Sequence, residues 1–166
     1  MPIEFTGVQG LMLKGVRELL AESATFRTLV GAADSAAAKL HIFECEFQYV
    51  AASRPYACLW FGPGFVWRGD AGLNYSVAAK GTIELWIEIN SSGADAAEKA
   101  KNFSNLIDAI LNDMATLSGE DSRVVIRSFN QVIPPTRWTG EEFDSKTDTS
   151  AEDYFTVAFL LEIGDE

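Results

Sequence analysis

The segment that most constrains this chain is an alternating run followed at once by a long amphipathic run. In residues 81–90, aliphatic side chains occupy every second position: Ile83, Leu85, Ile87 and Ile89. This period of two predicts a β-strand with one face against a core. In residues 94–117, apolar side chains recur every three or four positions: Ala96, Ala100, Phe103, Leu106, Ile107, Ile110, Leu111, Met114 and Leu117. That stripe predicts a helix about 35 Å long, enough to cross a sheet.

The N-terminal part predicts a broken helix and two strands. Apolar spacing in residues 7–31 predicts a helix that breaks near Ser23, which caps a second short helix ending at Gly31. The Ala-rich residues 32–39 predict a loop or a frayed turn. Residues 40–49 alternate and predict a strand, and residues 54–62 predict another, with Pro55 at its first position.

Two long connections interrupt the remaining elements. The Gly- and Pro-rich residues 62–79 predict an irregular segment. A strand over residues 123–133 is expected to close at Pro134-Pro135, and residues 134–152 form the second long loop. Residues 154–163 predict the last strand. Long loops in compact domains are often functional, so both segments are candidates for binding.

The resulting order, α-α-β-β-β-α-β-β, predicts an α+β fold in a single domain spanning residues 1–166. We expect a mostly antiparallel or mixed sheet of four to five strands. Helix 94–117 and the N-terminal helix should pack on it. If strands 81–90 and 123–133 are parallel neighbours, the helix between them makes a right-handed crossover.

Charge and composition exclude several classes of protein. The 166 residues carry a net charge of −11; residues 1–83 are neutral and residues 84–166 hold the whole excess. No cluster of basic residues fits a nucleic-acid backbone, so we expect no binding to it. The apolar content of 48% argues against disorder, and no apolar run is long enough to span a membrane. The N-terminus lacks the pattern of a signal peptide.

No motif for catalysis, metal binding or cofactor binding stands out. His41 is the only histidine, and no nucleophile motif accompanies it. Gly62-Pro63-Gly64 is not followed by a helical pattern, as a phosphate loop requires. The acidic residues 141–148 do not match a calcium loop. Cys45 and Cys58 lie in apolar strand patterns and are expected to pack as small hydrophobes in a reducing compartment. We therefore expect no enzyme activity, no cofactor and no metal.

Large aromatic side chains in the two long loops are the strongest candidates for a binding role. Exposed aromatics are enriched at protein–protein interfaces, although such side chains can also fold back onto the core. A further tryptophan falls on the polar face of strand 81–90. The interface candidates are Phe65, Trp67, Arg68, Trp86, Trp138 and Phe143.

The order of short motifs resembles that of the tail terminator, or tail completion, proteins of tailed bacteriophages and prophages. The N-terminal helical region ends in Leu29-Val30-Gly31, a strand begins at Pro55-Tyr56, and the long helix contains Ile107-Asp108-Ala109-Ile110-Leu111. The resemblance covers roughly residues 8–163. The chain departs from the usual pattern in its Ala-rich residues 32–39 and in its longer loop 134–152.

The resemblance implies a structural virion protein. Subunits of this family form a ring, expected to be a hexamer, on the head-proximal end of the tail tube. The ring ends tail polymerisation and offers a surface for head–tail joining. The implied partners are other copies of the chain, the tail tube protein, a head-side connector or neck protein, and a sheath if the tail is contractile. DNA would be passing cargo, for which an acidic lumen would be suitable, and assembly would occur in the host cytoplasm without membranes.

Two alternatives remain open at the level of sequence. The chain could be another ring-forming protein, such as a connector, a neck subunit or the tail-tube protein itself. It could also be a small enzyme or ligand-binding module with a pocket between sheet and helix, which would need convergent polar groups there.

Overall fold

A computed structural model describes residues 7–47, 50, 52–67, 79–120, 124–138 and 154–164. Helices and strands follow one another in an α+β order, and the structure confirms the predicted fold class with its mixed, mostly antiparallel sheet. The helical elements are α1 (Val8–Glu22), α2 (Ala24–Val30), α3 (Ser35–Ala38), the 3-10 turn η1 (Lys39–His41) and α5 (Ala96–Leu117). The strands are β1 (Ile42–Phe43), β2 (Tyr56–Phe61), β3 (Val66–Trp67), β4 (Ala79–Asn90), β5 (Ile126–Trp138) and β6 (Tyr154–Ile163).

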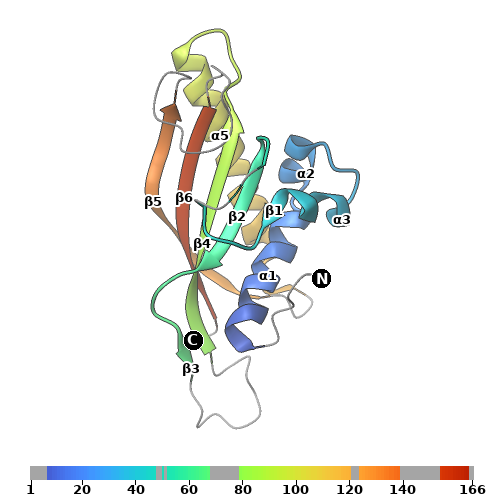
Figure 1. Cartoon of the computed structure of the whole chain (residues 1–166), viewed down its shortest axis with the longest axis vertical. Coiled ribbons are helices and arrows are strands. Elements are labelled where there is room, and N and C mark those ends of the chain that lie inside the picture. Colours follow the sequence, from blue (N-terminus) through green and yellow to red (C-terminus); the bar gives the residue numbers. More distant parts are fainter. Residues whose placement is uncertain are drawn as a thin grey trace.

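The main sheet has the order β1-β2-β4-β6-β5, with β1 parallel to β2 and the other neighbours antiparallel. Strands β4 and β5 are therefore not neighbours, because β6 lies between them. The condition under which we expected a direct parallel crossover is not met. At its start, β4 also pairs with β3, through Val66 opposite Lys80. This two-stranded β3–β4 ribbon continues the sheet beyond the body of the molecule (Figure 1).

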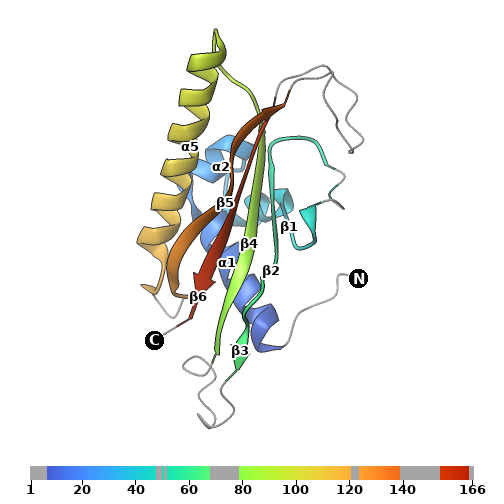
Figure 2. The same cartoon turned by 90° about the vertical axis from the view of Figure 1, so that its left-hand side faces the viewer.

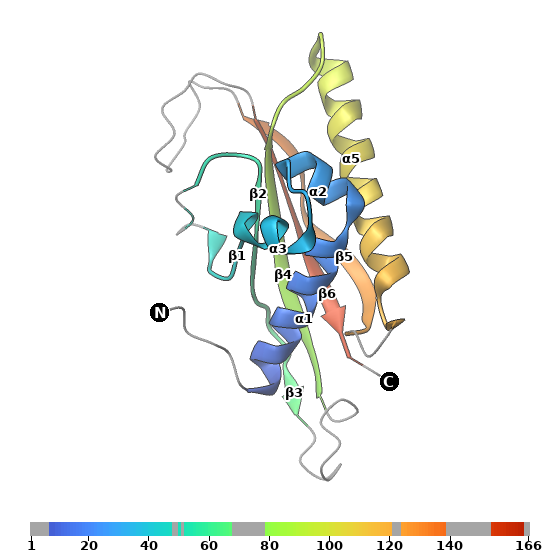
Figure 3. The ribbon, with the colours of Figure 1, turned by 90° about the vertical axis from the view of Figure 1, so that its right-hand side faces the viewer.

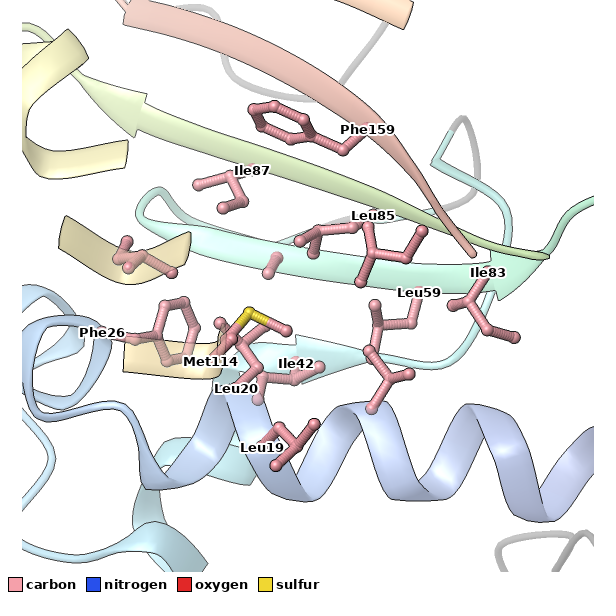
Figure 4. Close-up of a cluster of buried hydrophobic side chains, with 14 of the residues drawn as sticks. Leu19, Leu20, Phe26, Ile42, Leu59, Ile83, Leu85, Ile87, Met114 and Phe159 are labelled. Carbon is pink, nitrogen blue, oxygen red and sulfur yellow. The ribbon is translucent and has the colours of Figure 1, made fainter. Parts of the chain in front are cut away.

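One face of the sheet, here called the inner face, packs against α1, α2 and α5. Its aliphatic side chains come from alternate positions of β2, β4 and β6, as the predicted alternation requires. Leu59, Leu85 and Leu161 have no exposed surface. Figures 2 and 3 show α5 and α1 along this face, and Figure 4 shows side chains such as Leu19, Phe26 and Met114 meeting those of the sheet.

The predicted break between α1 and α2 is confirmed at Ser23. Its buried hydroxyl accepts a hydrogen bond from the Phe26 amide and donates one to Asp113 Oδ2, at 2.7 Å. The Thr25 amide donates to the same carboxylate oxygen, at 3.1 Å. Helix α2 ends, as expected, at Gly31, whose φ of 70° suits glycine. Asp113 thus ties the helix break to α5.

The prediction of a strand over residues 40–49 is wrong for most of its length. In the described part of this segment, residues 40–47, the chain completes η1 and then has only two paired residues, Ile42 and Phe43. The alternation of Phe43, Cys45 and Phe47 is nevertheless meaningful, because all three side chains pack on the same small hydrophobic cluster. Their period-two spacing arises because alternate side chains of this segment pack on one face of the sheet.

Pro134-Pro135 does not end a strand, contrary to our expectation. Strand β5 continues through both prolines to Trp138 and pairs with β6 along its length. β5 is an edge strand, with a neighbouring strand on one side only. A proline can therefore lack its amide hydrogen there without leaving an acceptor on a neighbouring strand unpaired. Its register shifts between Gln131 and Ile133 and again before Thr136, which accommodates the prolines as irregularities.

Two segments expected to lack regular structure contain short elements. Within residues 32–39, Asp34 caps α3 by accepting a hydrogen bond from the Ala37 amide, at 2.8 Å. Within residues 62–79, Val66 and Trp67 form β3. The predicted strands 54–62, 81–90 and 154–163 and the helix 94–117 match β2, β4, β6 and α5 closely.

Candidate functional site

The opposite, outer face of the sheet carries a different kind of side chain. Register places Tyr56, Cys58 and Trp60 of β2 on it, next to Glu88, Trp86 and Glu84 of β4. On β6 the corresponding positions are Tyr154, Thr156, Ala158, Leu160 and Glu162. Aromatic and charged groups therefore share this face, in contrast to the apolar inner face. Interfaces are typically enriched in such aromatic side chains.

The segment between β1 and β2, here called the overlying segment, covers part of this outer face. Phe47 stacks on Trp86, with ring centroids 4.2 Å apart. Val50, Tyr56 and Cys58 form the buried centre of the resulting cluster. Trp86, proposed from sequence as an exposed contact residue, is thus partly covered by its own chain. Its indole N–H donates to Glu84 Oε1.

A buried ion pair lies beside this cluster. Arg54 Nε donates to Glu88 Oε1 at 2.6 Å, and the two side chains are only 3% and 1% exposed. The Tyr56 hydroxyl also donates to the Glu88 carboxylate. Burial raises the pKa of Tyr56, and the negative charge of Glu88 raises it further, so the hydroxyl stays protonated at neutral pH. Glu88 on β4 is therefore held by two donors, Arg54 just before β2 and Tyr56 at the first position of β2.

The same arginine connects the ion pair to the end of β5. The guanidinium carbon of Arg54 lies 3.5 Å from the centroid of the Tyr154 ring, a close cation–π contact. On the neighbouring strand, Trp138 pairs with Tyr154, and their rings stack at 6.5 Å with an interplanar angle of 22°. Trp138, predicted on a loop, instead occupies the last position of β5 and is partly buried.

The other candidates lie in or near the β3–β4 ribbon or outside the described residues. Phe65 is partly buried against the inner core, and its ring lies close to Gly81. Trp67 belongs to β3, and nothing is described of its side chain. Arg68 and Phe143 lie outside the described residues.

The structure does not gather the sequence candidates into one site. Trp86 on β4 and Trp138 on β5 share the outer face with β6 between their strands, whereas Phe65 belongs to the inner face. Between Trp86 and Trp138 lie the groups that the sequence did not single out, namely Arg54, Glu88 and Tyr154. Glu88 appeared to be one of several solvent-facing acids in an alternating strand. Its partner is 34 residues away, and no local pattern indicates that pairing.

The remaining chemical candidates have ordinary environments. Cys58 is buried, Cys45 is partly buried, and both pack in the outer cluster, as the packing prediction expected. His41 lies in η1, directly before β1. In the described part of the chain, no group of three or more His, Cys, Asp or Glu side chains could hold a metal ion. Among the same residues, no helix has both the length and the apolar character needed to cross a bilayer.

A scan against protein-family models and a search of curated proteins found no match to this chain.

Proposed function

We propose that this chain is a structural, non-enzymatic subunit of a phage tail or tail-like particle, and specifically a tail terminator. In this role several copies, expected to be six, form a ring on the head-proximal end of the tail tube. Its partners would be other copies of itself, the tube protein and a head-side connector. The proposal rests on the resemblance in motif order.

The observation that carries the proposal is where those motifs lie in the fold. Gly31 of the first motif ends α2 in the left-handed conformation, and Pro55-Tyr56 leads into β2 next to the buried ion pair. Ile107 and Ile110 of the third motif are buried in the inner core. Each motif therefore occupies a position that the fold needs, which supports a shared architecture better than scattered surface matches would.

The β3–β4 ribbon is the surface most suited to contact another subunit. It extends the sheet beyond the helix-covered body (Figure 1) and its Val66 side chain is 52% exposed. Two-stranded ribbons bury little surface of their own and gain stability by packing on something else. Contact between such a ribbon and a different patch on the next copy is heterologous, and it closes into a ring when the rotation permits.

The mechanism would be steric. A ring seated on the growing end of the tube covers the surface that the next ring of tube subunits would occupy. Polymerisation then stops without any covalent chemistry, and the exposed side of the ring remains available to the head-side partner. The aromatic candidates in the ribbon and at the end of β5 would supply the contact area.

The test is the native mass of the purified chain, measured by light scattering, with negative-stain images of the same fraction. A closed ring near six times 18.1 kDa supports the terminator. Long tubes would instead identify a tail-tube subunit. A stable monomer at all accessible concentrations would count against self-assembly as the basis of function and favour a ligand-binding module.

A matched pair of substitutions tests the ribbon. Val66 on β3 and Val132 on β5 are 52% and 53% exposed, so Val→Thr at either site should leave unfolding nearly unchanged. If the ribbon contacts the next copy, Val66→Thr should weaken ring formation by about threefold to tenfold per contact, because a buried methyl group is replaced by a hydroxyl. Val132→Thr should have no effect. If Val66→Thr leaves ring formation unchanged, the ribbon does not lie in the interface.

A further inference from the structure

Four side chains form a continuous chain of contacts across the outer face, from the segment before β2 to the end of β5. Glu88 on β4 binds Arg54, Arg54 covers the ring of Tyr154 on β6, and Tyr154 stacks with Trp138 on β5. The contacts link three strands and the overlying segment. Their two ends differ in exposure, because Glu88 is 1% exposed whereas Trp138 is only partly buried.

The buried ion pair at the Glu88 end of this row of contacts adds little net stability. Removing two charges from water costs several kcal/mol per ion, and well-packed apolar residues often serve as well or better. The pair is nevertheless fully engaged, since Glu88 accepts from both Arg54 Nε and the Tyr56 hydroxyl. Such a pair fixes the guanidinium in one orientation, because its hydrogen bonds are directional.

The fixed guanidinium in turn restricts Tyr154. A cation lying 3.5 Å from the ring centroid holds the ring flat against it, and the ring is only 7% exposed. Trp138 is the cross-strand partner of Tyr154, so the tyrosine ring is the surface on which the indole rests. Trp138 is also the last described residue before the segment that contains the candidate Phe143.

We propose that Arg54, Glu88 and Tyr154 are positioning residues that hold Trp138 in a fixed orientation for contact with a second copy of this chain. This inference rests on the proposed ring-forming function and names one of its contacts. Pre-organised aromatic side chains lose less conformational entropy on association, so fixing Trp138 before assembly strengthens the contact. The ion pair acts on assembly through Tyr154, and it does not touch the partner.

Two adjacent residues on β6 provide a matched test. Tyr154 faces outward and supports Trp138, whereas Phe155 faces inward and stacks on Phe103 at 4.8 Å. Tyr154→Leu and Phe155→Leu each remove one aromatic stack and keep an aliphatic side chain in nearly the same place. Tyr154→Phe retains the ring, its contact with Arg54 and its stack with Trp138, and serves as the conservative variant.

Two readouts separate positioning from a general loss of stability. The first is the 19F NMR spectrum of protein labelled with 5-fluorotryptophan, in which the Trp138 signal is assigned by its loss in Trp138→Phe. The second is the dissociation constant of the ring, from light scattering over a dilution series, with the melting temperature measured for every variant.

We expect Tyr154→Leu to shift or broaden the Trp138 signal and to weaken the ring about tenfold or more, equivalent to about 1.4 kcal/mol per contact. Phe155→Leu should lower the melting temperature at least as much, yet leave the Trp138 signal and ring affinity close to wild type. Tyr154→Phe should behave as wild type in both readouts. If ring affinity follows melting temperature across the three variants, the residues have only a structural role and the proposal is overturned.

The design also separates this inference from the proposed function. If the wild-type protein forms no ring but the Trp138 signal still responds to Tyr154→Leu alone, then Tyr154 does position Trp138 and the ring proposal fails. If rings form and Tyr154→Leu leaves both the signal and the affinity unchanged, the positioning role fails and the ring proposal stands.

Discussion

The two faces of the sheet are built by different rules, although they share the same strands. On the inner face, side chains from alternate positions of β2, β4 and β6 join those of α1 and α5 in one hydrophobic cluster without charged groups. On the outer face, aromatic, charged and small side chains alternate across neighbouring strands, and the overlying segment covers only part of them. The inner face is a core defined by periodicity. The outer face depends on contacts between residues far apart in the sequence.

The largest expected difference between the faces comes from the same substitution on each. Leu85 on β4 is fully buried on the inner face, whereas Leu160 on β6 lies partly exposed on the outer face. Leu85→Ala should lower the free energy of unfolding by about 3–5 kcal/mol, because it leaves a cavity that the core cannot fill. Leu160→Ala should cost about 1 kcal/mol, since water can occupy part of the vacated space. Urea denaturation of both variants measures the difference.

If the two variants lose similar free energy, the outer face is as well packed as the inner one. The comparison would then be wrong, and the outer face around Leu160 would have to be regarded as a second core. Matching denaturant slopes in the two variants and the wild type would show that both values refer to the same unfolding transition.

The sequence predicted the inner face well for a physical reason. Burial of one strand face imposes a period of two, and burial of one helix stripe imposes a period of 3.6, so both are visible locally. This is why β4, β6 and α5 were predicted almost to the residue. The errors occur where tertiary contacts override local preference: residues 44–47 alternate without forming a strand, and β5 passes through Pro134-Pro135 because it lies at the sheet edge.

The second expected effect concerns the buried ion pair. Glu88→Leu leaves the Arg54 guanidinium buried without its carboxylate partner, and breaking such pairs typically costs about 3 kcal/mol or more. The Tyr56 hydroxyl loses an acceptor as well. Thermal and urea unfolding of this variant should therefore show a loss almost as large as that of Leu85→Ala, despite its place on the outer face.

The double variant Arg54→Met with Glu88→Leu sharpens the interpretation. Because it removes both charges and keeps apolar volume, it should recover much of the stability lost by Glu88→Leu. Ring affinity should not recover, since no guanidinium remains against Tyr154. Recovery of both properties together would mean that the pair contributes only packing, and the outer face would then resemble the inner one more closely than we argue.

The candidate site was less predictable than the fold. The tryptophans were identified because large aromatics on polar faces are conspicuous in any sequence, and Trp86 and Trp138 do share the outer face. Arg54 and Glu88 were not identified, because a buried acid in an alternating strand looks the same as an exposed one. Only the three-dimensional pairing of positions 34 residues apart distinguishes them.

The smallest expected effect compares Glu88 with a carboxylate that has neutral partners. Asp113 on α5 accepts hydrogen bonds from the Ser23 hydroxyl and the Thr25 amide. Its partial burial alone would raise its pKa, but these hydrogen bonds outweigh that effect and lower the pKa below its ordinary value of 3.8. Asp113→Asn should cost roughly 1 kcal/mol at neutral pH, because the amide oxygen can still accept but carries no charge.

The sign of the pH dependence follows from the lowered pKa. Well above pH 3.8, Asp113 is ionised in both the folded and the unfolded chain, so its full contribution to stability is present. As the pH falls below 3.8, the unfolded chain takes up a proton first, and the contribution declines. The difference in unfolding free energy between wild type and Asp113→Asn should therefore be constant from pH 7 to 5 and shrink toward pH 3. Asp108→Asn, an exposed change on the same helix, should show no such difference. If the Asp113 difference instead grew on acidification, the carboxylate would be unfavourable in the folded state, and neutral donors would not be enough to hold a charge at the helix break.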